Sequence, residues 1–274
     1  MTEQKRRFFR LYPAIALVFC FLMISISQAA NVVLEQQWSQ QLSENVDKEQ
    51  VRLLKAVDLE FLGLYIESVG QPQGAAVVVH GAGHHPDWPE VISPLRNGLP
   101  DYGWASLSIQ MPGTDLNAPA EEYAPLISEG VQRISSAVEW LKKEGIFNIA
   151  IIGHDLGATS ALAYLSGQGD EAVRVFAAIS LSGNTVVDDG FNRIAAIRKL
   201  KIPVLDIYGG EDLGHIIDSA KFRRDAARRG QNGDYSQVRV PGADHFFTQH
   251  SDRLVKRVRS WLQRGAPGSE IETN

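Results

Sequence analysis

The polar residues best placed for chemistry occur in four short motifs, each directly after a predicted β-strand. The first motif, Gly153-His154-Asp155-Leu156-Gly157, lies between a predicted strand at 149–152 and a predicted helix at 156–165. Glycines on both sides of a central residue permit a tight strand-to-helix turn, the nucleophile elbow, which points that residue into a site. The helix N-terminus also stabilises negative charge there. Asp155 is therefore the candidate nucleophile.

The second motif supplies groups that such a nucleophile needs. Gly81, Ala82 and Gly83 follow a predicted strand at 75–79. A loop in that place supplies one backbone N–H of an oxyanion hole, and the residue after the nucleophile, Leu156, supplies the other. We expect these residues to line one pocket together with His154.

An acid and a base follow two later predicted strands. Asp212 comes after the strand at 203–208, where an orienting acid belongs, and Glu211 is the alternative acid. His245 comes after the strand at 235–240, where the base belongs. The chain order nucleophile, acid, histidine is the one expected when all three groups follow strands of one sheet. The sequence thus predicts Asp155, His245 and Asp212 as a catalytic set.

The elements that must position these residues alternate between strands and helices. A meander of two strands is expected over 51–68, and further strands are predicted at 75–79, 104–110, 149–152, 175–181, 203–208 and 235–240. Helical spacing is found over 89–98, 123–144, 156–165, 219–229 and 252–263. This alternation predicts an α/β fold with a mostly parallel sheet covered by helices on both faces. Ligands of such sheets bind beyond the carboxyl ends of the strands, where the four motifs lie.

From about residue 51 to residue 262 the chain resembles a Gram-negative family of exported α/β-hydrolase-like domains of unknown function. The resemblance is carried by HGAGHHPDWPEV, YGWASLSIQMP, GHDLGA, KIPVLDIYG and VRVPGADHFF. It implies the α/β-hydrolase fold and export, and it implies no substrate.

The elbow is also similar to that of the Asp-nucleophile hydrolases, the haloalkane dehalogenases and epoxide hydrolases. Three features depart from them. Leu156 stands where dehalogenases commonly have a halide-binding Trp, and Gly83 stands where epoxide hydrolases usually have Pro. The segment 183–201 is too short for their helical cap, so we expect little or no cap domain.

Asp155 has two interpretations. As a nucleophile, an ionised carboxylate can displace a halide or open an epoxide, giving an ester that His-activated water hydrolyses. Attack on an ordinary ester would give an anhydride, which argues against a serine-type esterase. As a structural residue, Asp155 would cap the following helix at a degenerate elbow. The two hypotheses are therefore a hydrolase and a non-catalytic binding or envelope-associated module.

The N-terminus is typical of an export signal. Lys5, Arg6, Arg7 and Arg10 precede an apolar run over 14–26 and small residues at 27–29. We predict a signal peptide at 1–29, a flexible leader at 30–50, the hydrolase-like domain at 51–264 and a disordered tail at 265–274. The protein is then periplasmic or secreted, and it touches a membrane only if the signal segment stays uncleaved as an anchor.

Composition limits the partners. The formal net charge is −5 and the sequence pI is about 5.8, with no basic stripe after the first ten residues, so nucleic acid is not expected. His80, His84, His85 and Asp87 could be imagined as metal ligands, but a pocket-lining loop is the simpler interpretation. We predict no metal or cofactor and a small molecule of unknown identity as substrate or ligand.

Overall fold

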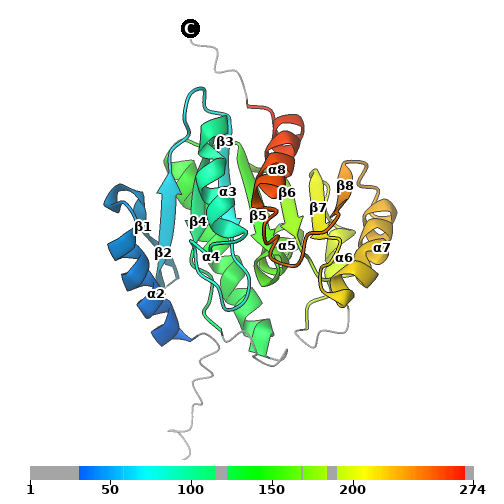
Figure 1. The fold of residues 1–274 in the computed structure, drawn as a ribbon, viewed down its shortest axis with the longest axis horizontal. Helices are drawn as coiled ribbons and strands as arrows, with labels where there is room; N and C mark the ends of the chain where they lie inside the picture. Colours follow the sequence, from blue (N-terminus) through cyan, green and yellow to red (C-terminus); the bar gives the residue numbers. More distant parts are fainter. Residues whose placement is uncertain (1–30, 58, 115–121, 168, 184–189, 269–274) are drawn as a thin grey trace, which may run out of the picture.

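The computed structural model describes residues 31–57, 59–114, 122–167, 169–183 and 190–268. Within them an eight-stranded sheet runs in the order β1-β2-β4-β3-β5-β6-β7-β8 (Figure 1). β1 and β2 are antiparallel to their neighbours, and all other pairs are parallel. The strands are β1 Val51–Ala56, β2 Leu59–Ile66, β3 Gly74–Val79, β4 Trp104–Ile109, β5 Ile149–His154, β6 Val173–Ile179, β7 Val204–Gly209 and β8 Tyr235–Val240. The predicted mostly parallel sheet is confirmed.

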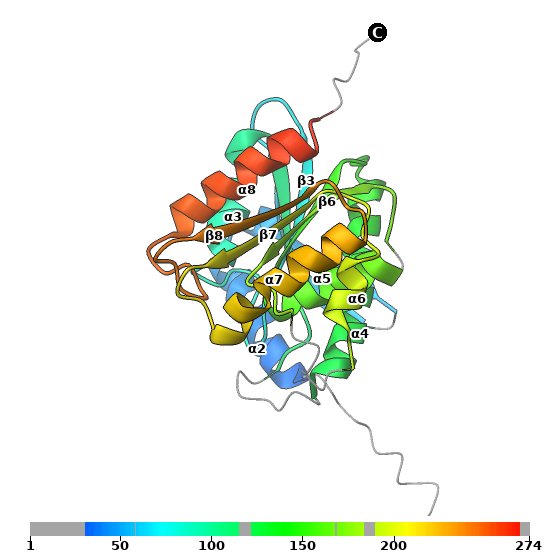
Figure 2. The ribbon, with the colours of Figure 1, turned by 90° about the vertical axis from the view of Figure 1, so that its right-hand side faces the viewer.

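Helices cover both faces of the sheet, as Figure 2 shows edge-on. α3 (Ile92–Gly98) and α8 (Ser251–Gly265) lie on one face, while α4 (Tyr123–Lys143), α5 (Leu156–Gly167), α6 (Arg193–Ile197) and α7 (Gly214–Arg229) lie on the other. This is the α/β-hydrolase architecture that the sequence predicts.

The central strand β3 explains why two separate cores form. Its residues alternate between them: Val77 and Val79 pack with α4 and α5, whereas Ala76 and Val78 pack with α3 and α8. A strand that is buried on both faces must be apolar throughout, and the run Ala75–Val79 meets that requirement. The sites after such central strands therefore rest on a rigid base.

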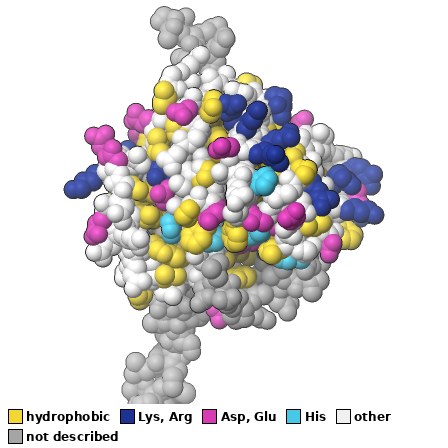
Figure 3. Space-filling view, in the orientation of Figure 1, with side chains coloured by type: hydrophobic (Ala, Val, Ile, Leu, Met, Phe, Trp, Pro, Cys, Tyr) yellow, Lys and Arg dark blue, Asp and Glu magenta, His cyan; other side chains and the backbone are white. Residues whose placement is uncertain are grey.

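The C-terminal helix α8 shows the opposite pattern, with one apolar stripe and one charged side. Its buried residues are Leu254, Val258, Trp261 and Leu262. Its outer side exposes Arg253, Lys256, Arg257 and Arg264. These account for Lys and Arg side chains that gather over α8 in Figure 3, with acidic side chains among them. The patch is the solvated side of an amphipathic helix.

The prediction of a flexible leader at 30–50 is wrong for residues 32–45, which form the helix α2 (Val32–Asn45). The Asn31 side chain caps this helix by accepting from Leu34 N at 3.1 Å. Glu35 joins it to the domain, accepting from Gly113 N at 2.7 Å and lying 2.8 Å from the guanidinium of Arg133. The polar composition of the segment conceals this helix because only Glu35 and Leu42 are buried, the first in an ion pair with Arg133 and the second against Leu62 and Leu64.

Other boundaries differ by a few residues. α3 begins at Ile92 rather than at Pro89, and α7 begins at Gly214, five residues before the predicted start. The predicted tail is packed at its beginning, because Ala266 is buried and its carbonyl accepts from Asn148. The segment 183–201 contains the short helix α6 in its described part.

Two predictions on the chain ends lie outside the described residues. These are the signal peptide at 1–29 and the rest of the tail at 269–274. Of the helices that the structure describes, none combines the length and apolar character needed to cross a bilayer.

Candidate active site

Asp155 occupies the turn between β5 and α5, where the sequence predicts a nucleophile elbow. Its φ is 52°, in the left-handed region that Asp tolerates better than most residues. The flanking glycines are sterically required: a Cβ on Gly153 would lie 2.6 Å from Ala158 Cα, and one on Gly157 would lie 2.3 Å from the His80 carbonyl oxygen. The sequence motif therefore forms the turn that its spacing predicts.

The loop after β3 faces the Asp155 carboxylate. Ala82 N donates a long hydrogen bond of 3.5 Å to Asp155 Oδ2. Gly81 passes so close that an added Cβ would lie 3.1 Å from Asp155 Cβ. Gly83 has a φ of 68°, which a glycine adopts without strain. The loop thus presents a backbone N–H to the carboxylate, where the oxyanion hole is expected.

His80 holds this loop in place through two hydrogen bonds and does not line the cavity. Its Nδ1 donates to the Gly81 carbonyl at 2.8 Å, and its Nε2 accepts from Met111 N at 2.9 Å. Burial lowers the pKa of His80 to about 3, so the ring is neutral at pH 7. The neutral tautomer that donates from Nδ1 satisfies both bonds.

Asp212 and His245 form a buried pair after β7 and β8. His245 Nδ1 lies 2.8 Å from Asp212 Oδ1. Asp212 Oδ2 accepts from Ser180 Oγ at 2.6 Å and from Gly209 N at 3.1 Å. The structure thus pairs His245 with Asp212, whereas the alternative acid, Glu211, is exposed.

The charges of this pair favour the ionic forms. Burial opposes ionisation of Asp212, but hydrogen bonds from His245 and Ser180 outweigh it and hold the pKa of Asp212 below its usual value. Burial also disfavours the charged form of His245, yet Asp212 and the nearby charge of Asp155 raise the pKa of His245 above its usual value. The site therefore stabilises an imidazolium, as a general base requires once it has taken a proton.

Asp155 and His245 line one cavity of about 330 Å³ at the carboxyl end of the sheet. Its wall is made by Ala82, His84, Tyr123, Asp155, Leu156, Thr159, Ser182, Arg193, Leu213, His215, His245 and Phe246. The volume is at the small end of the range for ligand pockets. Nucleophile and base candidates thus share a small, partly closed space.

Of the predicted pocket residues, Ala82 and Leu156 reach the cavity wall together with Asp155 and His245. His154 lies behind the wall instead, where its Nε2 donates to the His245 carbonyl at 3.1 Å. Burial, and after it the nearby charge of His245, lower the pKa of His154 to about 4. His154 is therefore a neutral support for the His245 loop and not a lining residue.

The wall residue Thr159 and the supporting residue Ser180, which does not line the cavity, escaped sequence analysis because no motif marks them. Thr159 follows the elbow by one helical turn, and its hydroxyl accepts from Arg193 Nε at 3.1 Å. Ser180 has a φ of 51° at the end of β6 and holds Asp212. Its place after a central strand is the only signal that could have identified it.

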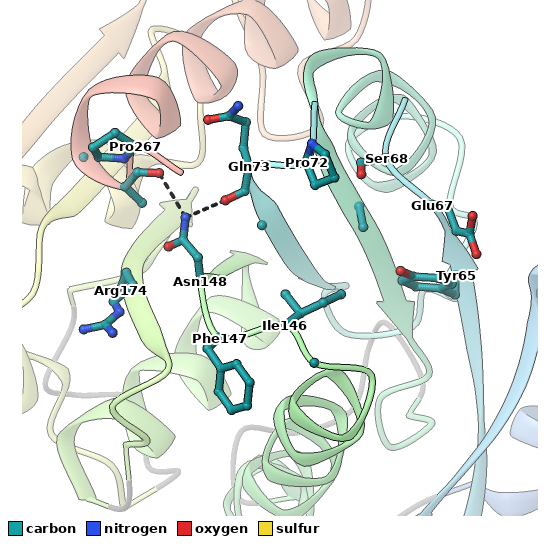
Figure 4. A pocket seen from close by; sticks show the side chains of 15 residues that line it. Tyr65, Glu67, Ser68, Pro72, Gln73, Ile146, Phe147, Asn148, Arg174 and Pro267 are labelled. Carbon is teal, nitrogen blue, oxygen red and sulfur yellow. Dashed lines mark hydrogen bonds between the residues drawn. The ribbon is translucent and has the colours of Figure 1, made fainter. Parts of the chain in front are cut away.

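A larger cleft of about 860 Å³ lies at the opposite end of the sheet, beside the amino ends of β3 and β5 (Figure 4). Asn148 donates there to the carbonyls of Gln73 and Ala266, at 2.7 and 3.2 Å. Arg174 and Glu67 stand on opposite walls, and no histidine is among the lining residues. The smaller cavity is thus the better candidate, because it alone of these two contains an acid, a base and an elbow.

The histidine-rich loop does not gather metal ligands. Among the described residues, no group of three or more His, Cys, Asp or Glu side chains has an arrangement that could hold a metal ion. His85 Nδ1 instead accepts from Asp87 N at 3.2 Å, and Asp87 pairs with Arg96 at 3.0 Å.

Comparison with known proteins gives a family and a fold. The family model described as "Protein of unknown function (DUF3530)" matches residues 24–130 and 127–264. No curated protein matches the sequence.

Solved structures of α/β hydrolases are similar to this chain. Est1E from Butyrivibrio proteoclasticus has a TM-score of 0.64 at 13% identity, covering 79% of this chain and 98% of its own. Dienelactone hydrolase from Anabaena variabilis has a TM-score of 0.62 at 18% identity, covering 79% and 99%. A Xanthomonas campestris protein, described as an a/b serine hydrolase without lid, has a TM-score of 0.60 at 15% identity, covering 80% and 95%. At these identities the likeness shows the fold alone.

Proposed function

This chain belongs to the DUF3530 family of proteins of unknown function, and from its site we propose a hydrolase in which Asp155 is a covalent nucleophile. His245 is the general base and Asp212 the orienting acid. One observation carries the proposal: the Asp155 carboxylate lies on an elbow, in the same cavity as a histidine that is hydrogen-bonded to a buried acid. Two-step hydrolysis through an alkyl ester requires a carboxylate as nucleophile and a histidine base that is hydrogen-bonded to a second acid.

In the first step, one Asp155 oxygen attacks a saturated carbon of the substrate, and the leaving group departs with the bonding electrons. Oδ2, which faces Ala82 N at 3.5 Å, becomes the carbonyl oxygen of the resulting ester. In the second step, His245 takes a proton from water, and the hydroxide adds to Asp155 Cγ. The negative charge then develops on Oδ2, where the Ala82 N–H and the expected Leu156 N–H stabilise it. Collapse of this intermediate breaks the bond from Cγ to the alkyl oxygen, the departing alcohol takes the proton from His245, and the Asp155 carboxylate forms again with one oxygen from water and loss of a proton.

The proposed substrates are alkyl electrophiles such as halides and epoxides, and not carboxylic esters. The similar Xanthomonas protein is described as a serine hydrolase, and this chain has Asp155 at its elbow. A carboxylate that attacks an ester gives an anhydride, a poor intermediate, whereas its attack on an alkyl carbon gives a stable ester.

The alternative is a binding module that keeps the fold without the chemistry. The observation that favours it is the same 3.5 Å contact, because a carboxylate beside Ala82 N at the start of α5 also has a structural explanation. In that case Asp155 stabilises the loop and helix, and no covalent intermediate forms.

The decisive experiment traps the ester. In His245→Gln the first step proceeds but the water step is blocked, so incubation with short alkyl halides or epoxides should add the mass of the alkyl group to the protein. Peptide mapping should place the added mass on Asp155, and the double variant with Asp155→Asn should show none. Absence of adduct with every electrophile, in a folded protein, would favour the binding module.

Export remains part of the proposal. The charged and apolar segments before residue 30 support a periplasmic or secreted protein. Cell fractionation and the mass of the purified chain test it, since a chain that keeps residues 1–29 in the cytosol contradicts export by a cleaved signal.

A further inference from the structure

Phe147 is an exposed aromatic side chain at the end of the sheet opposite Asp155. It lies between α4 and β5 and is 59% exposed. It borders both the cleft of about 860 Å³ and a second hollow of about 360 Å³. A single exposed aromatic ring is common on protein surfaces, but a ring between two hollows has a shape that a partner can enclose. Phe147 is therefore a candidate contact residue.

The cleft beside Phe147 has an apolar middle and a charge on each side. Tyr65 and Ile146 are among its lining residues. Figure 4 shows Arg174 on one side of the cleft and Glu67 on the other. Ile146 and Phe147 lie between them.

The two charges face solvent without a partner of their own. Arg174 and Glu67 are both exposed, and among the described residues neither makes an ion pair or a side-chain hydrogen bond. Asp170, which lines the second hollow together with Arg174, is already paired with Lys142 at 2.7 Å. Arg174 and Glu67 are thus available to charges that a partner brings.

Opposite charges on the two sides of one cleft are complementary to a second copy of the same surface. In a dimer with two-fold symmetry, a contact between residue i of one protomer and residue j of its partner is repeated as a contact between j and i. When the two-fold axis runs along the cleft, the rotation exchanges its two sides. Arg174 of each protomer then lies opposite Glu67 of the partner subunit, and this contact occurs twice.

The same rotation places Phe147 in the partner's cleft. Phe147 lies on the side of Arg174, because both border the second hollow. The rotation therefore carries the ring toward the side of the partner's cleft that holds Tyr65. An apolar cavity of about 150 Å³ holds a benzene molecule, so a cleft of about 860 Å³ has room for the ring. An aromatic anchor at the centre with charges at the rim is the usual arrangement of a specific interface.

We propose that the cleft at the amino ends of β3 and β5 is the interface of a two-fold symmetric homodimer. Phe147 of each protomer enters the cleft of the other, and Arg174 pairs with Glu67 across the axis. Asp155 lies at the carboxyl end of the sheet, so the interface leaves both candidate active sites uncovered. The dimer does not depend on the chemistry proposed for Asp155.

The first test reverses one charge at a time and measures the dissociation constant of the purified protein by sedimentation equilibrium. Glu67→Arg leaves arginine on both sides of the cleft, and Arg174→Glu leaves glutamate on both sides. Each variant alone should dimerise at least about tenfold more weakly than the parent, because like charges then meet twice. An equimolar mixture of the two variants should recover the affinity of the parent, because every arginine then meets a glutamate. A mixture that associates no better than its components would overturn the proposed pairing.

The second test removes the aromatic anchor. Phe147→Ser should weaken the dimer at least about tenfold, since the ring fills the partner's cleft. Phe222→Ser is the matched control, because Phe222 is 60% exposed on α7 and lines neither hollow, and it should leave the dimer unchanged. Circular dichroism and urea unfolding should show both variants folded like the parent.

Two results would refute the interface. One is a parent protein that stays monomeric up to about 100 μM, in which case the cleft is open to a different protein or a small ligand. The other is a dimer that Phe147→Ser and both charge reversals leave intact, because the two copies then meet through another surface.

Discussion

The charge of Asp155 links the elbow to the His245–Asp212 pair. The pKa of His245 is raised because the hydrogen bond to Asp212 and the negative charge of Asp155 outweigh the opposing effect of burial. In the proposed reaction, this coupling changes during turnover, since the ester has no charge. While the ester is present, His245 is therefore a weaker proton acceptor, and once protonated it gives its proton more readily to the departing alcohol.

This coupling gives a prediction that needs no substrate. Asp155→Asn removes a negative charge near His245, so protonated His245 is less favoured and its pKa falls. An NMR titration of the imidazole resonances should show the midpoint move to lower pH. Asp218→Asn, which removes an exposed acid from α7, should leave it in place. An unchanged midpoint in Asp155→Asn would mean that the two side chains do not interact.

At the residue scale, sequence spacing identified the groups that follow strands. Asp155 directly follows β5, Asp212 and His245 lie in the loops after β7 and β8, and glycines mark the elbow. The interpretation of the histidine-rich loop as pocket-lining holds for His84, which is in the cavity wall. Spacing did not identify Ser180, because its role depends on the Asp212 carboxylate that lies next to it in space and not in the sequence.

At the scale of elements, the elbow depends on the close approach of α5 to the β3 loop. Gly157 sits in the first turn of α5, where a Cβ would lie 2.3 Å from the His80 carbonyl oxygen and 2.5 Å from the Val79 carbonyl oxygen. Both contacts are with backbone, so neither can move aside without shifting the loop that faces Asp155.

Gly157→Ala should therefore lower the free energy of unfolding by about 2–3 kcal/mol, as overpacking against rigid neighbours does. Gly167→Ala is the matched control in the same helix, because a Cβ there meets nothing within 4 Å. It should be neutral or stabilise by about 0.5–1 kcal/mol through reduced chain entropy. Urea unfolding of both variants checks the contrast, and equal stabilities would contradict the close approach.

The helix α2 is an element that the sequence pattern did not predict. Its Gln- and Glu-rich composition is typical of a loose leader, yet Glu35 reaches the fully buried Arg133 of α4. Burial raises the pKa of Glu35, against the opposing charge of Arg133. Apolar periodicity reveals helices that pack by hydrophobic burial. It is a weak signal for α2, which buries only Glu35 and Leu42 and is attached through an ion pair with Arg133 and a small apolar cluster around Leu42.

At the scale of the whole molecule, the sheet order brings distant motifs to one end. β3, β5, β6, β7 and β8 are neighbours and parallel, so the residues after them meet although they are up to 165 positions apart. Alternation of strands and helices predicted this arrangement, because parallel strands with covered faces leave few other topologies. As a consequence, four histidines lie near one another at the carboxyl end of the sheet: His80, His84, His154 and His245.

Three of these histidines make the folded protein sensitive to acid. Burial lowers the pKa of His80 and His84 to about 3 and that of His154 to about 4. The unfolded chain binds protons at these residues below about pH 6.5 while the folded chain does not, so stability falls as pH falls below that value. The raised pKa values of His245 and Glu35 act in the opposite direction and offset part of the loss.

At one pH unit below 6.5, each neutral histidine costs about 1.4 kcal/mol, so the three together should lower stability by about 4 kcal/mol between pH 7.5 and pH 5.5, less the offset from His245 and Glu35. His84→Phe removes one protonation site that the folded state excludes, while it keeps an aromatic ring against Trp88. It should therefore lose about 1 kcal/mol less than the parent over the same range. Urea unfolding at pH 7.5, 6.5 and 5.5 measures both slopes. A parent protein as stable at pH 5.5 as at pH 7.5, or a variant with an unchanged slope, would show that these rings become protonated in the folded state and that the cavity is open to water.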